Sequence, residues 1–233
     1  MRYEHIIPGT FLSRPNRFIA HVDVGGETAV CHVKNTGRCR ELLVPGGLVY
    51  LQDFGPDVSG RKTRYDLIGV KKERPGGPLL INMDAQAPNK VFAQWAGAGQ
   101  FRPDLTLLRP ETVYGASRFD FYYETAAGAR GFVEVKGVTL EENGRALFPD
   151  APTERGVKHL EELMRAREQG YAAHVCFVIQ MSGMTAFSPN DATHPAFGAA
   201  LRRAVEAGVD AFAVECAVTP ETLEITGRVN TEL

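Results

Sequence analysis

Cysteine is scarce in this sequence, and long apolar runs are absent. The four cysteines form no C-x-x-C pair and no cluster with histidine, which argues against a zinc site or a disulfide framework. No window approaches the roughly 18 consecutive apolar residues of a membrane span, and the first residues show no signal-peptide pattern. These absences predict a folded cytoplasmic protein with reduced thiols and no membrane contact. The thiols are those of Cys31, Cys39, Cys176 and Cys216.

Charged residues are present in ordinary amounts, 23% of the chain, but they are unevenly distributed. Residues 1–80 carry 12 Lys and Arg against 8 Asp and Glu, whereas residues 81–233 carry 14 against 20. A mildly basic first part beside an acidic remainder suggests two modules with different roles. An imbalance of this size also arises by chance, so charge alone does not decide between the two explanations.

The first part is predicted to be a small β-barrel. Short β-rich runs are separated by turn residues, and Gly25-Gly26 is typical of a hairpin. Five such strands without a helical pattern favour an OB-like barrel, a fold that commonly binds nucleic acid. The expected strands are 17–24, 28–33, 48–54, 64–70 and 78–82. We therefore predict a first domain over residues 1–84.

The remainder, residues 85–233, is predicted to be an α/β domain with a mixed central sheet. Val91, Phe92 and Trp95 have helical spacing, and the tryptophan is interpreted as a packing residue. A second helix begins after the N-cap candidate Thr153 and stops at Gly170. The expected helices are 88–97, 154–169 and 197–207, and the expected strands are 112–114, 118–124, 131–138, 175–179, 210–218 and 223–229.

One predicted hairpin carries the residues best suited to catalysis. Asp120 lies on its first strand, and Glu134 and Lys136 lie on its second. Side chains alternate along a strand, so Phe119 and Phe121 are expected on one face, with Arg118, Asp120 and Tyr122 on the other. On the second strand, Val133 and Val135 face the core, while Glu134 and Lys136 share the opposite face. The hairpin would then bring two carboxylates and an amine together at a sheet edge.

This set of groups suits metal-dependent phosphodiester hydrolysis. Carboxylates are the hard oxygen ligands that Mg²⁺ prefers, and a bound metal activates water and polarises phosphate. The lysine would neutralise charge on the phosphate. The alternative is an ordinary cross-strand ion pair on a solvated face, because a single E-x-K pattern occurs by chance in many chains.

Several cations are candidate phosphate contacts. On the barrel they occur in three stretches, 14–18, 35–38 and 61–65. The first and third stretches also contain an aromatic residue, which can stack on a base, and the second contains Thr36. At the start of the helix over 154–169, further basic residues would add to the helix dipole. Charged turns and a solvated helix face are the alternatives. The predicted DNA contacts are Arg17, Arg38, Arg61, Lys62, Arg118, Arg155, Lys158 and His159.

These motifs together resemble the sugar fermentation stimulation protein family, SfsA. The stretches that carry the resemblance run in order along nearly the whole chain: 16–18, 35–38, 45–46, 61–62, 117–121, 134–140 and 148–163. The resemblance implies an OB-like domain, a C-terminal domain of the PD-(D/E)XK nuclease type, DNA binding and a regulatory link to sugar utilisation. It assigns the acidic position of the nuclease pattern to Asp120 and the E-x-K to Glu134 and Lys136. Gly137 replaces the serine of some relatives.

The sequence therefore predicts a DNA-binding protein with a nuclease-like metal site. Asp120, Glu134 and the carbonyl of Val135 are the expected ligands of Mg²⁺ or Mn²⁺, and Lys136 is the expected electrostatic catalyst. No other small-molecule cofactor is expected, and the oligomeric state stays open, with a homodimer as one option. The main alternative is a non-catalytic DNA-binding regulator linked to sugar metabolism. A sugar-modifying enzyme finds no supporting motif.

Overall fold

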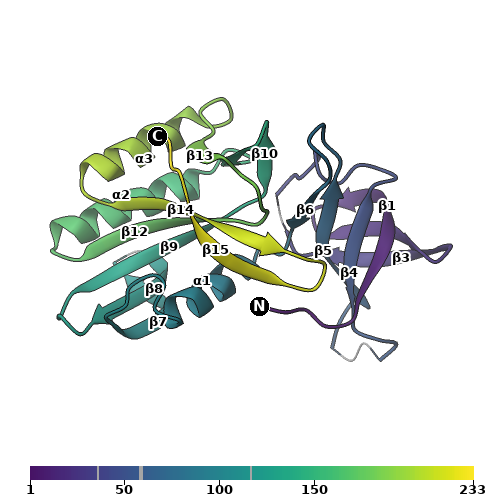
Figure 1. Ribbon diagram of the computed structural model, residues 1–233, viewed down its shortest axis with the longest axis horizontal. Coiled ribbons are helices and arrows are strands. Elements are labelled where there is room, and N and C mark those ends of the chain that lie inside the picture. Colours follow the sequence, from purple (N-terminus) through teal and green to yellow (C-terminus); the bar gives the residue numbers. More distant parts are fainter. Residues whose placement is uncertain (36, 58–59, 116) are drawn as a thin grey trace.

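The computed structural model describes residues 1–35, 37–57, 60–115 and 117–233. It places a β-barrel beside a larger α/β part (Figure 1). The barrel belongs to a six-stranded sheet of order β3-β2-β1-β4-β5-β6, and the additional pairing of β3 with β5 closes it around β1 to β5. The sheet is formed by β1 Ile6–Asn16, β2 Ile19–Val24, β3 Glu27–Val33, β4 Leu48–Asp53, β5 Tyr65–Lys72 and β6 Leu79–Asn82.

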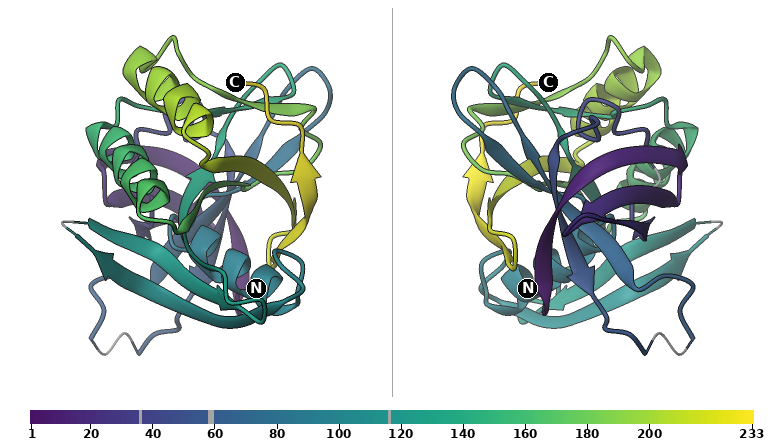
Figure 2. Two further views of the ribbon diagram at one scale, coloured as in Figure 1. Left: turned by 90° about the vertical axis from the view of Figure 1, so that its left-hand side faces the viewer. Right: turned by 90° about the vertical axis from the view of Figure 1, so that its right-hand side faces the viewer.

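The OB-like barrel is confirmed, but its longest strand, β1, was not predicted. Its sequence contains Pro8 and Pro15, residues that disfavour a strand assignment. Pro8 lies in a regular ladder with β4, whereas Pro15 lies within the second of two register shifts against β2. The strand curves across the barrel in the right-hand view of Figure 2. Gly9 permits this close packing, because an added Cβ would lie 2.5 Å from Cγ1 of Val22.

The second part is built on another six-stranded sheet, of order β15-β14-β12-β9-β8-β7. The sheet is mixed, as predicted, because β12 runs parallel to both β9 and β14 while the other pairs are antiparallel. A smaller sheet of order β10-β11-β13 was not predicted. The strands are β7 Leu105–Tyr114, β8 Ser117–Thr125, β9 Arg130–Val138, β10 Leu140–Glu142, β11 Arg145–Phe148, β12 Ala172–Ile179, β13 Ala186–Pro189, β14 Asp210–Val218 and β15 Leu223–Val229.

Helices cover both faces of this sheet. The helix α1 (Ala87–Gly97) lies on one face, and α2 (Glu154–Glu168) and α3 (Pro195–Glu206) lie on the other (Figures 1 and 2). Two apolar cores result, one containing Phe92 of α1 and the other containing Leu160 of α2. The predicted helix signals are confirmed: the Thr153 side chain accepts a hydrogen bond from Gly156 N, and Gly170 has a φ of 86°.

Two further expectations concern the tryptophan and the cysteines. Trp95 packs against the rings of Phe92, Phe101 and Phe212, as expected of a packing residue. All four cysteines are buried free thiols. Over the described ranges, no helix has the length and apolar character needed to cross a membrane.

A buried polar network joins the barrel to the second part. The amide of Gln180, which follows β12, donates to the backbone and side-chain oxygens of Asn82 and to the carbonyl of Asp84. Asp84, fully buried, also accepts from Lys34 at 2.6 Å. These bonds fix the end of β6 against the second sheet. The domain boundary between residues 84 and 85 stays a prediction, although it falls between the end of β6 and the start of α1.

We expect Gln180→Leu to lower the free energy of unfolding by about 2 kcal/mol or more, because buried acceptors would lose their donor. Chemical denaturation at neutral pH measures the change. Gln94→Leu, on the exposed side of α1, is the matched control and should change stability by no more than about 0.5 kcal/mol. Equal effects of the two substitutions would show that the network contributes nothing to stability.

Candidate functional site

The candidate site forms where β8 and β9 stop pairing with each other. Their ladder runs from Glu124 opposite Arg130 to Phe121 opposite Val133. Beyond that point the backbone N–H of Val135 donates to Oδ2 of Asp120 at 2.8 Å. The Asp120 carboxylate therefore lies against the β9 backbone, one residue from Glu134.

The hairpin itself is confirmed, but the predicted arrangement of its faces is wrong in part. Phe119 packs on Phe132 and Phe121 packs on Phe92, and the two partners belong to different cores. Strict alternation fails because Asp120 turns toward Val135 where the ladder ends. The site lies where the β8 side of β9 is no longer paired, while β12 still pairs with β9 on the other side.

Asp120 is held by two hydrogen bonds. Besides the bond from Val135 N to Oδ2, the side-chain amide of Asn89 on α1 donates to Oδ1 at 2.8 Å. Burial, with the nearby charge of Glu134 as a second cause, raises the pKa of Asp120 above its usual 3.8. A cation beside the Asp120 carboxylate would favour its charged form and lower this pKa again.

Glu134 is only 3% exposed. One of its oxygens, Oε1, interacts with both Lys136 Nζ, at 2.6 Å, and the His159 ring. The other oxygen, Oε2, is buried and has no hydrogen-bond partner in the described structure. Burial alone would raise the pKa of Glu134, but the bond from His159 and the charge of Lys136 outweigh it and lower the pKa. Glu134 is thus held as a carboxylate with one uncommitted oxygen.

His159 is part of this cluster and does not lie on the surface as predicted. It is 6% exposed, and its Nε2 accepts from Nε of Arg155 at 3.2 Å. An accepting Nε2 places the ring proton on Nδ1, which then donates to Glu134. The helical i, i+4 spacing therefore links Arg155 to Glu134 through His159. Because it is buried, His159 is a support of Glu134 and not a direct phosphate contact.

The other predicted cations fall into two groups. Arg17, Arg38, Lys62 and Lys158 are exposed and available to a partner. Two more arginines are already engaged: Arg61 with Asp66 and the face of Phe54, and Arg118 with Glu111 at 3.1 Å. Thr36, within the predicted loop motif, lies outside the described residues.

The structural roles of three residues around these sites could not be read from the sequence. Asn89 reaches Asp120 from a different element. Arg14, which sequence placed among the phosphate-binding cations, instead donates to four backbone carbonyls of neighbouring loops. Gly137 has no room for a side chain, since an added Cβ would lie 2.5 Å from Oε1 of Gln180.

The donor set fits a divalent cation that keeps several waters. Among the described residues, no group of three or more His, Cys, Asp and Glu side chains forms a complete metal cage. Mg²⁺ is commonly held by one or two carboxylates, with water and substrate oxygens completing the octahedron. Asp120 and Glu134 Oε2 supply such a partial set, and the structural observation behind this fit is the unpartnered buried oxygen.

The fold and the site together define a two-part protein in which an OB barrel is joined to an α/β domain with a buried acid–acid–lysine cluster. Sequence comparison agrees with both parts: the profile of the SfsA N-terminal OB domain matches residues 12–81, and that of the sugar fermentation stimulation protein RE domain matches residues 86–222. The chain belongs to the sugar fermentation stimulation protein family.

Relatives match over their full length. A sugar fermentation stimulation protein homolog of Desulfitobacterium hafniense is 56% identical over 100% of this chain and 99% of the relative. A homolog of Clostridium beijerinckii is 51% identical over 99% of each chain. The solved structure of Pyrococcus furiosus SfsA in complex with Ca²⁺ superposes with a TM-score of 0.87 at 28% identity, covering 100% of this chain and 98% of that one.

When EDTA keeps metals away, we expect the free energy of unfolding of Asp120→Asn to rise with pH relative to that of the wild type. The native pKa of Asp120 is raised above 3.8, so the native state holds this proton to higher pH than the unfolded state. Wild-type stability from this group therefore falls as pH rises through the interval above 3.8. The variant lacks that loss, so the difference in stability should move in its favour across the same interval, in addition to a pH-independent cost of the one hydrogen bond that an amide cannot accept.

Urea denaturation at several pH values measures this difference. Glu224→Gln, on the exposed side of β15, is the control and should track the wild type. A stability difference between variant and wild type that does not change with pH would contradict the raised pKa of Asp120.

Proposed function

We propose that this protein is a metal-dependent phosphodiester hydrolase that acts on DNA. Asp120, Glu134 and the carbonyl of Val135 would hold Mg²⁺ or Mn²⁺, and Lys136 would stabilise charge on the phosphate. The observation that carries the proposal is the buried carboxylate oxygen of Glu134 that has no partner, beside a second carboxylate whose pKa its charge helps to raise. A bound divalent cation would polarise the phosphate and activate water.

Residues around the carboxylates prepare the site. His159 and Lys136 bind the same oxygen of Glu134, so the other oxygen keeps one direction. Asn89 and the Val135 amide fix Asp120 in the same way. Because the two carboxylates are already held in place, they need not be reoriented during the reaction. The related Pyrococcus furiosus protein was solved in complex with Ca²⁺, which supports a divalent-cation site because Ca²⁺ also prefers oxygen ligands.

DNA is the proposed substrate because of the cations around the site and on the barrel. Arg17, Arg38 and Lys62 on the barrel and Lys158 on α2 are exposed, and a polyanion gains affinity by releasing counterions at such residues. The buried free thiols agree with a reducing cytoplasm as the proposed location.

The second candidate is a DNA-binding regulator that does not cleave. It is favoured by one observation, the bond between Lys136 Nζ and Glu134 at 2.6 Å, which already engages the proposed catalytic amine. The Lys136 substitution described below separates the two candidates.

Wild-type protein is expected to gain about 5–10 °C in melting temperature with Mn²⁺ at roughly a hundred times its Kd, because the ion binds only the native state. Asp120→Asn removes one ligand charge and should lose this gain. Differential scanning calorimetry measures both proteins. Glu224→Gln should keep the full gain, and an equal gain in the Asp120 variant would place the metal elsewhere.

Lys136→Met keeps most of the aliphatic stem and deletes the cation. DNA cleavage should fall by about a hundredfold or more, the loss typical of one preorganised electrostatic group, while DNA affinity falls only slightly. Rates on radiolabelled DNA with Mg²⁺ or Mn²⁺ test this, with Lys90→Met on the exposed side of α1 as the control. Full cleavage by the Lys136 variant would refute its role. Lost binding in the absence of any wild-type cleavage would favour the regulator.

A further inference from the structure

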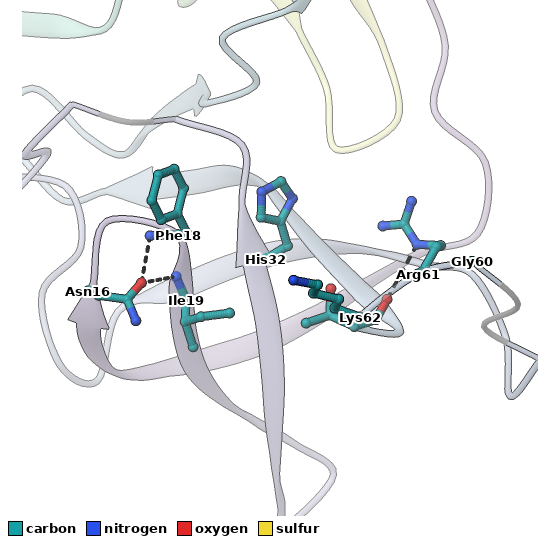
Figure 3. A pocket seen from close by; sticks show the side chains of 8 residues that line it. Asn16, Phe18, Ile19, His32, Gly60, Arg61 and Lys62 are labelled. Atoms are coloured by element: carbon teal, nitrogen blue, oxygen red, sulfur yellow. Dashed lines mark hydrogen bonds between the residues drawn. The ribbon is translucent and has the colours of Figure 1, made fainter.

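The barrel carries a pocket of about 610 Å³ away from the acidic cluster. It is bounded by the turn between β1 and β2, by β3 and by the segment that precedes β5 (Figure 3). These are the strand 2–3 face and the two loops through which OB folds bind oligomeric ligands. The pocket lining includes Asn16, Phe18, His32, Arg61 and Lys62.

An exposed aromatic ring stands on one wall of this pocket. Phe18 is 51% exposed, an unusual state for a phenylalanine on a folded barrel. Its turn is fixed, since the Asn16 side chain accepts hydrogen bonds from Phe18 N at 2.9 Å and from Ile19 N at 3.1 Å. The ring is therefore presented by a rigid backbone, which lowers the entropy cost of binding a flat ligand.

A buried carboxylate organises the opposite wall. Asp66 on β5 is 4% exposed and forms ion-pair contacts with Arg61 and, at 3.4 Å, with Nδ1 of His32. The rings of His32 and Phe18 project from the same side of the barrel (Figure 3). Lys62 is exposed and, in the part of the chain that the structure describes, has no acidic partner. The pocket thus combines two rings with one unengaged cation.

A second, basic pocket of about 460 Å³ shares one lining residue with the first. Asn16 lines both, and the second is also lined by Arg17, Arg38 and Arg40 of the barrel and by Ala151 and Pro152, which precede α2. The bonds from Arg14 to neighbouring carbonyls hold these loops together. The surface made by these two neighbouring pockets, called the track below, reaches from the barrel to the residues that precede α2. The helix α2 carries His159, which supports Glu134.

We propose that this track binds a single-stranded nucleic acid, with one base stacked at Phe18 and His32 and the following phosphates at Lys62, Arg17, Arg38 and Arg40. The inference rests on the proposed function in taking nucleic acid as the substrate, and adds that the segment is unpaired. Aromatic rings stack on any base face, but only when the base is not enclosed in a duplex. A row of cations beyond the rings matches a backbone that carries one charge per nucleotide.

Fluorescence anisotropy in EDTA tests this with labelled dT12, rU12 and a DNA duplex of twelve base pairs. Wild-type protein should bind both single strands more tightly than the duplex. Phe18→Ala should weaken single-strand binding by about tenfold, while Phe18→Trp, which keeps a stacking surface, should restore it. Val113→Ala, on a side chain 72% exposed on β7, is the apolar control and should bind as the wild type does. Lys62→Met should reduce the salt slope by about one.

The same variants separate this inference from the proposed function. Phe18→Ala should keep the full Mn²⁺ gain in melting temperature, because Phe18 is remote from the carboxylates. If it keeps that gain and also binds dT12 and rU12 like the wild type, the track is refuted while the metal site stands. Equal or tighter binding of the duplex by wild-type protein would overturn the inference as well. Unequal binding of dT12 and rU12, both reduced by Phe18→Ala, would support the track and show which sugar the site prefers.

Discussion

Glu134 places a buried negative charge on β9 of the second sheet, next to the point where pairing with β8 ends and opposite Val175 of β12. A buried charge of this kind costs several kcal/mol unless it is compensated. The structure compensates one oxygen with Lys136 and His159 and leaves the other without a partner. This incomplete compensation, next to the Asp120 carboxylate, is the constraint on which the functional interpretation depends. A structural ion pair would be expected to satisfy both oxygens.

The architecture around this charge explains why the site is rigid. Asp120 takes its position where pairing between β8 and β9 ends, and the amide of Val135 that would otherwise need a strand partner donates to it. Close beside the site, Gln180 packs over Gly137 and holds the end of the barrel sheet. The polar network that joins the two parts therefore reaches the residues next to the acidic cluster. The barrel surface and the cluster are fixed relative to each other by the same contacts.

Local patterns in the sequence were sufficient for most elements and for the central residues. Alternation along β9 and the cap at Thr153 are short-range features, and both were predicted correctly. The predictions that were wrong or missing concern long-range contacts or irregular strand pairing. The strand β1 was missed because its sequence contains two prolines and its pairing with β2 is irregular. The orientation of Phe119 was wrong because the β8–β9 ladder ends at Phe121. The burial of His159 depends on α2 packing against β9, which no local pattern records.

The central claim is that Asp120 and Glu134 hold a divalent cation, and a crystal soaked in Mn²⁺ tests it most directly. Anomalous diffraction locates manganese without reference to any assay of activity. The account predicts one strong anomalous peak within about 2.0–2.6 Å of Glu134 Oε2 and of an Asp120 oxygen, the range of oxygen ligands to such cations. It also predicts the loss of that peak in Asp120→Asn. A fully loaded crystal with its manganese elsewhere, and with Glu134 Oε2 still unpartnered, would contradict the account.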